Sequence, residues 1–182
     1  MPGATAPNQP PDDAPTRAPG GRSDPAAGPW LSAAEQRAWR SWLAAERLLV
    51  DRLDRQLQDE SGMSHADYEI LVHLSEADDD RMRMSELAQQ ALFSRSRLSH
   101  AVSRLERLGW VAREDCPTDR RGMFAVLTPP GLAALEAAAP GHVATVRRFV
   151  IDALGPDGVA QLERLTTCIR GALEERGPTP TG

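Results

Sequence analysis

The sequence contains few of the residues on which catalytic and metal sites depend. Its 182 residues include two cysteines, four histidines and no lysine, and only 4% are aromatic. Two cysteines do not make a disulfide framework. No run approaches the roughly 18 consecutive apolar residues of a membrane helix, and the N-terminus has no apolar signal core. We therefore expect a cytoplasmic protein that makes no membrane contact.

Sequence motifs of enzymes and metal sites are also missing. There is no glycine-rich phosphate loop, no HExxH and no serine or cysteine nucleophile with a recognisable partner motif. The histidines at positions 65, 73, 100 and 142 are scattered, and neither CxxC nor HxxxH occurs. We predict that the protein is not an enzyme and that it holds no cofactor and no metal.

The charge distribution is more informative than the total charge. The net charge of −5 argues against a chain that coats nucleic acid indiscriminately. Between Arg95 and Arg121, however, seven arginines face four carboxylates, which gives a local net charge of +3. A positive patch on an acidic body can bind DNA through one face.

Residues 94–109 have the pattern of a two-faced helix. Apolar residues recur at steps of three and four from Leu98 to Leu108, which predicts one buried face. Ser94 is a suitable N-cap, and Gly109 suits the left-handed position that ends many helices. The opposite face is basic and hydrogen-bonding, and consists of Arg95, Arg97, Ser99, His100, Ser103, Arg104 and Arg107.

A hairpin follows this helix. Residues 110–113 and 123–127 read as two strands around a turn that contains Pro117, Asp119 and Gly122. Met82 and Met84 alternate with arginines, which predicts a very short strand beside the hairpin. A basic helix followed by an arginine-tipped hairpin is the plan of a winged helix-turn-helix.

The sequence resembles the MarR family of bacterial transcription regulators over roughly residues 30–175. The resemblance is carried by Leu98-Ser99-His100-x-Val102-x-Arg104-Leu105-Glu106-x-x-Gly109-x-Val111, then Pro117-x-Asp119-Arg120-Arg121-Gly122, then Val126-Leu127-Thr128 and Gly131. His100 stands where many members have arginine, and Ser103 where many have aspartate. In the wing signature, Gly122 replaces a small residue and Ala125 replaces valine.

The resemblance implies a mainly α fold with a small β wing, a winged helix-turn-helix that dimerises through its N- and C-terminal helices. The domain would cover residues 30–176, with dimerisation helices in 30–62 and 129–176 and a DNA-binding lobe in 64–128. Residues 1–29 hold eight of the 15 prolines, so we expect a disordered tail there and a loose end at 177–182. Within the domain we expect capping boxes at Ser32 and Ser64, a cap at Ser85 and a kink or break at Pro140.

The implied function is sequence-specific regulation of transcription, as a repressor that is relieved by a small ligand, for which an aromatic molecule is the candidate. The protein would bind double-stranded DNA at a palindromic operator as a homodimer. Expected major-groove residues are Arg95, Ser96, Arg97, Ser99 and His100. Arg104 and Arg120 would touch phosphate, and Arg121, held by Asp119, would enter the minor groove. Trp39, Trp42, Tyr68 and His73 would line a ligand cleft, although plain packing is the favoured reading, since an aromatic stripe at helical spacing is usually core.

Two alternatives stay open. A winged helix can serve as a protein–protein interaction or dimerisation module without DNA binding, although this chain keeps arginines on the predicted recognition helix and wing. A cysteine-based redox-sensing regulator is the other alternative. Cys116 lies beside acidic residues that oppose thiolate formation, and Cys168 lies among apolar residues and is expected to be a small core residue.

Overall fold

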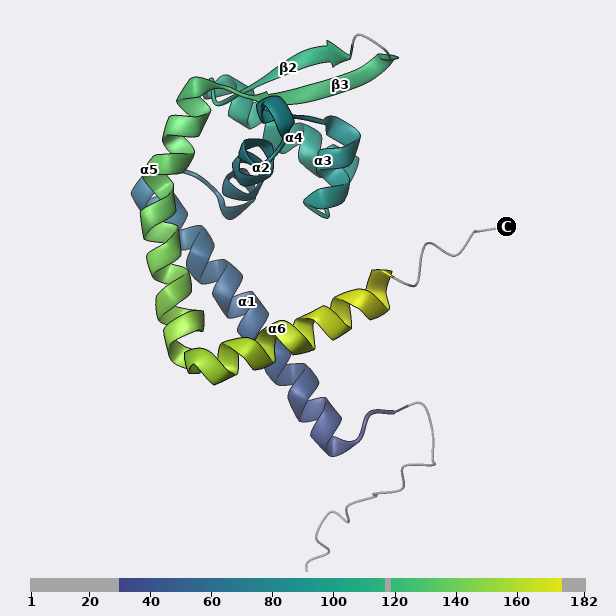
Figure 1. The fold of residues 1–182 in the computed structure, drawn as a ribbon, viewed down its shortest axis with the longest axis vertical. Helices are drawn as coiled ribbons and strands as arrows, with labels where there is room; N and C mark the ends of the chain where they lie inside the picture. The colour runs from purple at the N-terminus through teal and green to yellow at the C-terminus, as the bar shows by residue number, and fades with distance from the viewer. Residues whose placement is uncertain (1–29, 117–118, 175–182) are drawn as a thin grey trace, which may run out of the picture. The chain divides into compact units, whose positions relative to one another are not determined.

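The computed structural model describes residues 30–116 and 119–174, so the predicted tails at 1–29 and 177–182 lie outside the described residues. The chain divides into two compact units, residues 1–42 and 43–182. Its elements are α1 (Ala33–Ser61), α2 (His65–Ser75), β1 (Arg81–Arg83), α3 (Met84–Gln90), α4 (Arg95–Arg107), β2 (Val111–Cys116), β3 (Asp119–Leu127), α5 (Pro129–Val146) and α6 (Asp152–Glu174) (Figure 1). None of these described helices is long and apolar enough to cross a membrane.

The first two helices begin as predicted. The backbone N–H of Ser32 donates to Glu35 Oε2 (2.7 Å), and that of Glu35 donates to Ser32 Oγ (3.3 Å). Ser64 and Asp67 form the same reciprocal pair at the start of α2. Each capping box satisfies two N–H groups that a helix start leaves without partners. Gly62, with φ of +64°, ends α1 and so sets the tight connection to α2.

Helices α2, α3 and α4 enclose the core of the lobe. The buried side of α4 consists of Leu98, Ala101, Val102 and Leu105, as the helical spacing predicted. These residues join one cluster with Leu71 and Leu74 of α2 and with Leu87 of α3. The predicted burial of Leu108 is wrong, because this residue is the C-cap of α4 and is 49% exposed.

The wing is a three-stranded antiparallel sheet in the order β1-β3-β2. The predicted short strand is confirmed as β1, in which Met82 pairs with Ala125 of β3. Both hairpin strands are longer than predicted, and Gly122 lies inside β3 rather than in the turn. Helix α3 begins at Met84 after Arg83, whose side chain makes no capping bond, so the predicted cap at Ser85 is wrong.

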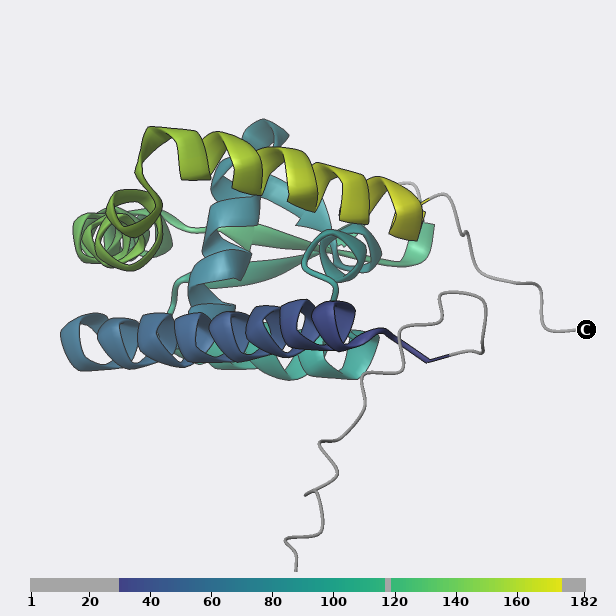
Figure 2. The same cartoon turned by 90° about the horizontal axis from the view of Figure 1, so that it is seen from below.

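The C-terminal helices depart from the prediction at one proline. Thr128 caps α5, accepting the N–H of Gly131 at Oγ1 (3.1 Å). No break occurs at Pro140, because α5 continues through it to Val146. Side chains of α1 approach α5 closely here, since an added Cβ at Gly141 would lie 2.1 Å from Glu60 Oε2. The irregular backbone comes later, in the π turn Arg147–Ile151 and at Gly155 of α6, where the chain changes direction (Figure 2).

The junction of the wing with α5 leaves no room for a side chain at Gly131. A Cβ added there would lie 2.0 Å from the carbonyl oxygen of Trp110, which is backbone and cannot rotate away. Gly131→Ala should therefore lower the free energy of unfolding by about 2–3 kcal/mol. Gly171→Ala is the control, since its Cβ would meet no described atom within 4 Å. Urea denaturation should show the control neutral or slightly stabilised, and equal losses would contradict the packing described here.

Candidate nucleic-acid interface

Helix α4 presents its polar residues to the surface and its apolar residues to the core. Arg95, Ser96, Arg97, Ser99 and His100 are all exposed, whereas Leu98 in their midst is buried. The structure thus brings the five predicted major-groove residues together on the first half of one helix. Ser94 fixes the start of that helix by accepting the N–H of Arg97 at Oγ (3.2 Å).

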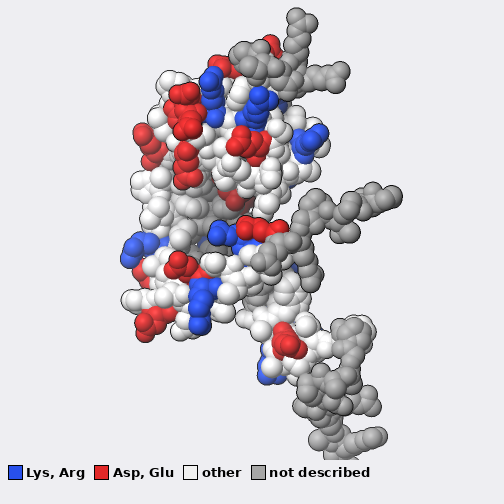
Figure 3. Space-filling model, turned by 45° about the vertical axis from the view of Figure 1, so that its right-hand side comes forward, with Lys and Arg blue, Asp and Glu red and all other residues white. Residues whose placement is uncertain are grey.

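The positive charge of the lobe is not one continuous patch. Figure 3 shows arginine and carboxylate side chains interspersed on the lobe that carries α2, α3 and α4. Arg97 illustrates the mixture. Its guanidinium lies over the ring of Phe93, 4.0 Å from the centroid, and it lines a hollow with Glu46 and Asp51 of α1. Arg97 therefore belongs to the exposed face of α4 and also borders a hollow that carboxylates of α1 line.

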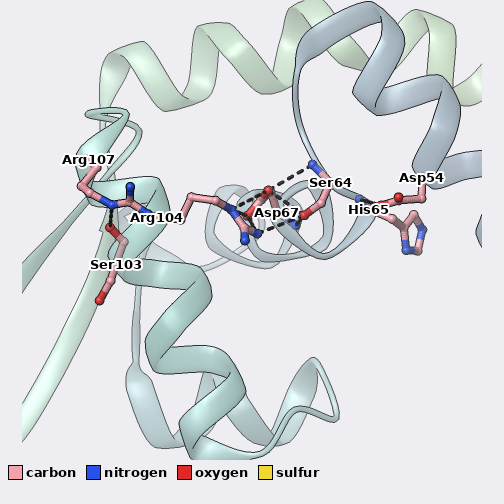
Figure 4. A network of polar contacts seen from close by, with 7 residues as sticks. All are labelled: Asp54, Ser64, His65, Asp67, Ser103, Arg104 and Arg107. Carbon is pink, nitrogen blue, oxygen red and sulfur yellow. Dashed lines mark hydrogen bonds and ion pairs between the residues drawn. The ribbon is translucent and has the colours of Figure 1, made fainter.

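Arg104 fastens α4 to the first turn of α2 (Figure 4). Its Nε donates to both oxygens of Asp67 at 3.1 Å, and its Nη2 donates to Ser64 Oγ at 3.1 Å and to Asp67 Oδ1. Asp67 is only 3% exposed, and it also accepts the backbone N–H and the hydroxyl of Ser64. The phosphate contact foreseen for Arg104 stays a prediction, but its guanidinium is already bound to a buried carboxylate.

A hollow of about 380 Å³ lies between the wing and α4. Its described lining includes three arginines and is made by Arg83, Met84, Ser85, Arg95, Leu98, Ser99, Arg113, Gly122 and Met123. Arginine side chains beside a polar helix face suit the phosphate oxygens of a nucleic acid. The side chains of Asp119, Arg120 and Arg121 lie outside the described residues, although their backbone belongs to β3. Their roles at the wing tip stay predictions.

Sequence reasoning missed the two side chains that brace α4, Asp67 and Arg113. Asp67 was identified only as a capping residue, yet it also binds Arg104, 37 positions away. Arg113 was placed in a strand without a role, yet it donates to Glu106 of α4. A carboxylate on the inward side of a helix start, facing a basic helix, is the only signal that could have suggested the first pair.

The predicted ligand-cleft residues fall in different units. Trp39 and Trp42 belong to residues 1–42 and are 52% and 42% exposed, whereas Tyr68 and His73 belong to residues 43–182. The Tyr68 ring stacks on His142 of α5, with centroids 4.3 Å apart. Burial raises the pKa of Tyr68. The pKa of His142 is lowered, mainly by burial and secondly by the charge of nearby His65. The cleft stays a prediction.

The two cysteines lie in different environments, and one of them is not where it was expected. Cys116 on the wing is buried, while Cys168 of α6 is exposed, so its expected place in the core is wrong. The reason is that the apolar stripe of α6 is uncovered, with Leu165, Ile169 and Leu173 at 49–71% exposure. Within the described residues, no cluster of three or more His, Cys, Asp or Glu side chains could hold a metal ion.

Known proteins resemble this chain both in sequence and in fold. A family model described as MarR family matches residues 61–122. The structure of Sco3205 from Streptomyces coelicolor, a MarR family transcriptional regulator in complex with DNA, is 51% identical, with a TM-score of 0.76 over 84% of this chain and 94% of that one. AbsC, a MarR family transcriptional regulator from the same organism, is 48% identical, with a TM-score of 0.76 over 81% of this chain and 99% of that one.

A curated relative is more distant. The HTH-type transcriptional repressor YetL of Bacillus subtilis is 32% identical over 85 residues, which are 47% of this chain and 51% of the repressor. The chain thus spans about half the length of the curated relatives it matches. The aligned portion of this chain is therefore limited, whereas the similarity to the two Streptomyces structures extends over most of the chain.

Removing Asp67 should destabilise the lobe far more than removing an exposed partner. Asp67→Ala leaves the Arg104 guanidinium and the N–H of Ser64 without their acceptor. Because the Arg104 side chain is 44% exposed, water replaces part of the interaction, and we expect a loss of about 2–3 kcal/mol. Asp51→Ala, which breaks an exposed pair with Arg55, should cost under about 1 kcal/mol. Similar urea midpoints for the two variants would show that the buried pair is not a brace.

Proposed function

The chain belongs to the MarR family of transcriptional regulators, and from this premise we propose that it binds a specific DNA sequence as a homodimer and so controls transcription. The observation that carries the proposal is the exposed polar half of α4, seated beside an arginine-lined hollow. The DNA complex of Sco3205, at 51% identity, supports it. Transcriptional regulators are not enzymes, and the proposal includes no catalytic step.

The proposed contacts divide between the two grooves. Arg95 and Ser99 reach base edges in the major groove, where an arginine can donate two hydrogen bonds to guanine. His100 and Ser96 give less decisive contacts, and Arg97 leaves the ring of Phe93 to join them. Arg120 binds phosphate. Arg121, oriented by Asp119, enters the adjacent minor groove, where a narrow A·T-rich groove has the more negative potential.

Exposed apolar side chains support the homodimer. Large apolar residues of the long helices have 41–71% of their surface in contact with solvent, namely Trp39, Trp42, Leu48, Val50, Val143, Phe149, Leu154, Leu165, Ile169 and Leu173. Contiguous exposed apolar patches mark interaction sites such as subunit interfaces. A two-fold dimer would place two α4 helices about 34 Å apart, one turn of B-DNA, and would therefore prefer a palindrome.

We further propose that the protein represses transcription until a small aromatic molecule releases it. Exposed indole rings at Trp39 and Trp42 support an aromatic ligand, because such rings stack readily on flat molecules. Tyr68 and His142 already stack on one another, so they need not take part. A titration of indole fluorescence with small aromatic acids, repeated with Trp39→Leu, would test this step separately from DNA binding.

The oligomeric state is the first measurable consequence. Sedimentation at micromolar concentration should give about twice the 19.8 kDa of one chain. Ile169→Glu places a charge on the uncovered stripe of α6 and should shift the protein toward 19.8 kDa, whereas Glu163→Gln, exposed on the same helix, should not. A monomeric parent that still binds a palindrome tightly would contradict the dimer.

DNA recognition is tested by a gel shift with the DNA upstream of the protein's own gene, followed by salt-controlled titrations. Arg121→Ala should weaken binding by about 1–3 kcal/mol, most strongly on operators with A·T-rich flanks. Asp119→Ala should give a smaller loss of the same kind, and Arg97→Ala should relax a major-groove preference instead. Arg55→Ala, on α1, controls for the loss of one arginine. If Arg121→Ala binds every duplex as the parent does, the wing does not read DNA.

A further inference from the structure

Arg113 of β2 reaches back from the wing to the recognition helix. Its Nη1 donates to Glu106 Oε2 (2.7 Å), and its Nη2 donates to Ser103 Oγ (3.1 Å) and to the backbone carbonyl of Ser99 (3.0 Å). The side chains of Arg113 and Glu106 are 24% and 30% exposed, so water competes less for this pair than for a surface pair. One arginine therefore binds three residues of α4.

The three acceptors lie along one side of α4. Ser99, Ser103 and Glu106 are spaced by four and three residues, so they follow one another over two turns of the helix. The planar guanidinium donates to them from several N–H groups in a fixed fork, which defines direction as well as distance. Because Arg113 also pairs with Ala125 of β3, the contact fixes both long strands of the wing.

Apart from Arg113, the described contacts between the wing and α4 are the shared apolar core and hydrogen bonds at the end of the helix. The N–H of Trp110 donates to the carbonyl of Leu105 (3.0 Å), and Gly109 adopts a φ of +73° between helix and strand. Those contacts fix the point where the strand leaves the helix. The contacts of Arg113 hold β2 against the middle of α4, at Ser99, which is itself a proposed base-contacting residue.

The charge of Arg113 is already balanced. Its guanidinium pairs with Glu106, although it borders the hollow that Arg83 and Arg95 also line. An arginine whose charge is balanced within the protein contributes little to the release of counterions from DNA. Arg113 therefore differs from a phosphate-binding arginine in a way that can be measured.

We propose that Arg113 is a positioning residue for DNA recognition, setting the placement of the wing relative to α4 so that both meet the same duplex. The proposal rests on the proposed function. A duplex presents its major groove and the adjacent minor groove at a fixed offset, so a wing held in place binds without first losing conformational freedom. Glu106 is the partner that keeps the guanidinium against the helix.

The direction in which Glu106→Ala changes the affinity for DNA distinguishes a positioning role from a long-range effect of charge. Removing a carboxylate from a DNA-binding face should strengthen binding if only long-range electrostatics matter. If Glu106 holds Arg113, the same change should weaken binding, by roughly three- to thirtyfold, the range for residues coupled in one network. Glu114→Ala is the matched control, because Glu114 is an exposed carboxylate on the same strand, next to Arg113. It should leave binding unchanged or slightly tighter.

Two readouts show whether Arg113 acts through the wing. Arg113→Ala should weaken binding with nearly the parent's dependence on salt, whereas a lost phosphate contact reduces the salt slope by about one. It should also reduce discrimination between A·T-rich and G·C-rich flanks. Arg113→Lys keeps the charge but not the fork, and should show the same loss of flank discrimination. A salt slope lowered by one, with Glu106→Ala binding more tightly, would overturn the proposal.

A measurement without DNA separates this inference from the proposed function. In the free protein, Arg113→Ala should speed amide hydrogen exchange in β2 and β3 while leaving α2 at the parent's rate. Unchanged exchange in the wing would also overturn the positioning role. If the parent binds no DNA sequence at all but the wing loosens as described, the proposed function fails and the structural link from Arg113 to the wing stands.

Discussion

The proposed DNA-binding surface depends on one buried carboxylate. Asp67 lies at the start of α2, is 3% exposed, and takes hydrogen bonds from Ser64 and from Arg104 of α4. A charge removed from water must be paired, so moving α4 away from α2 would leave the Asp67 carboxylate without Arg104 and would cost about 2–3 kcal/mol. The next residue, His65, donates its backbone N–H to Asp54 of α1 (2.9 Å), so the same short segment connects α4 to the long N-terminal helix.

Side-chain contacts hold α4 on two of its sides and leave one face of the helix for a ligand. Arg104 ties it to α2, and Arg113 ties it to the wing. Two arginines of the basic segment are therefore paired with carboxylates inside the protein and stabilise its fold. Arg95, by contrast, is exposed and lines the hollow beside the wing. The number of arginines in the sequence therefore overstates the number of cations available to DNA. The contacts of each arginine in the folded chain decide whether it is available.

The features that could be predicted from sequence are those whose causes lie within a few residues. Both capping boxes join residues three apart, and the buried face of α4 follows from helical spacing, so each was found. The ends of the hairpin strands were not found, because the wing is partly solvated and its alternation of polar and apolar residues is weak. The pair of Asp67 and Arg104 spans 37 positions, and only the folded chain brings it together. The break at Pro140 and the burial of Cys168 were wrong predictions, because α5 continues through the proline and nothing in the described chain covers the cysteine.

We propose that α4 and the wing form one surface, already assembled in the free protein, that a duplex then covers. Amide hydrogen exchange of the full chain, free and bound to its operator, tests this proposal. We expect α4 to be protected before DNA is added, and DNA to add protection in the first half of α4 and in β2 and β3. Slow exchange that arises in α4 only on binding, or DNA protection confined to α5 and α6, would contradict it.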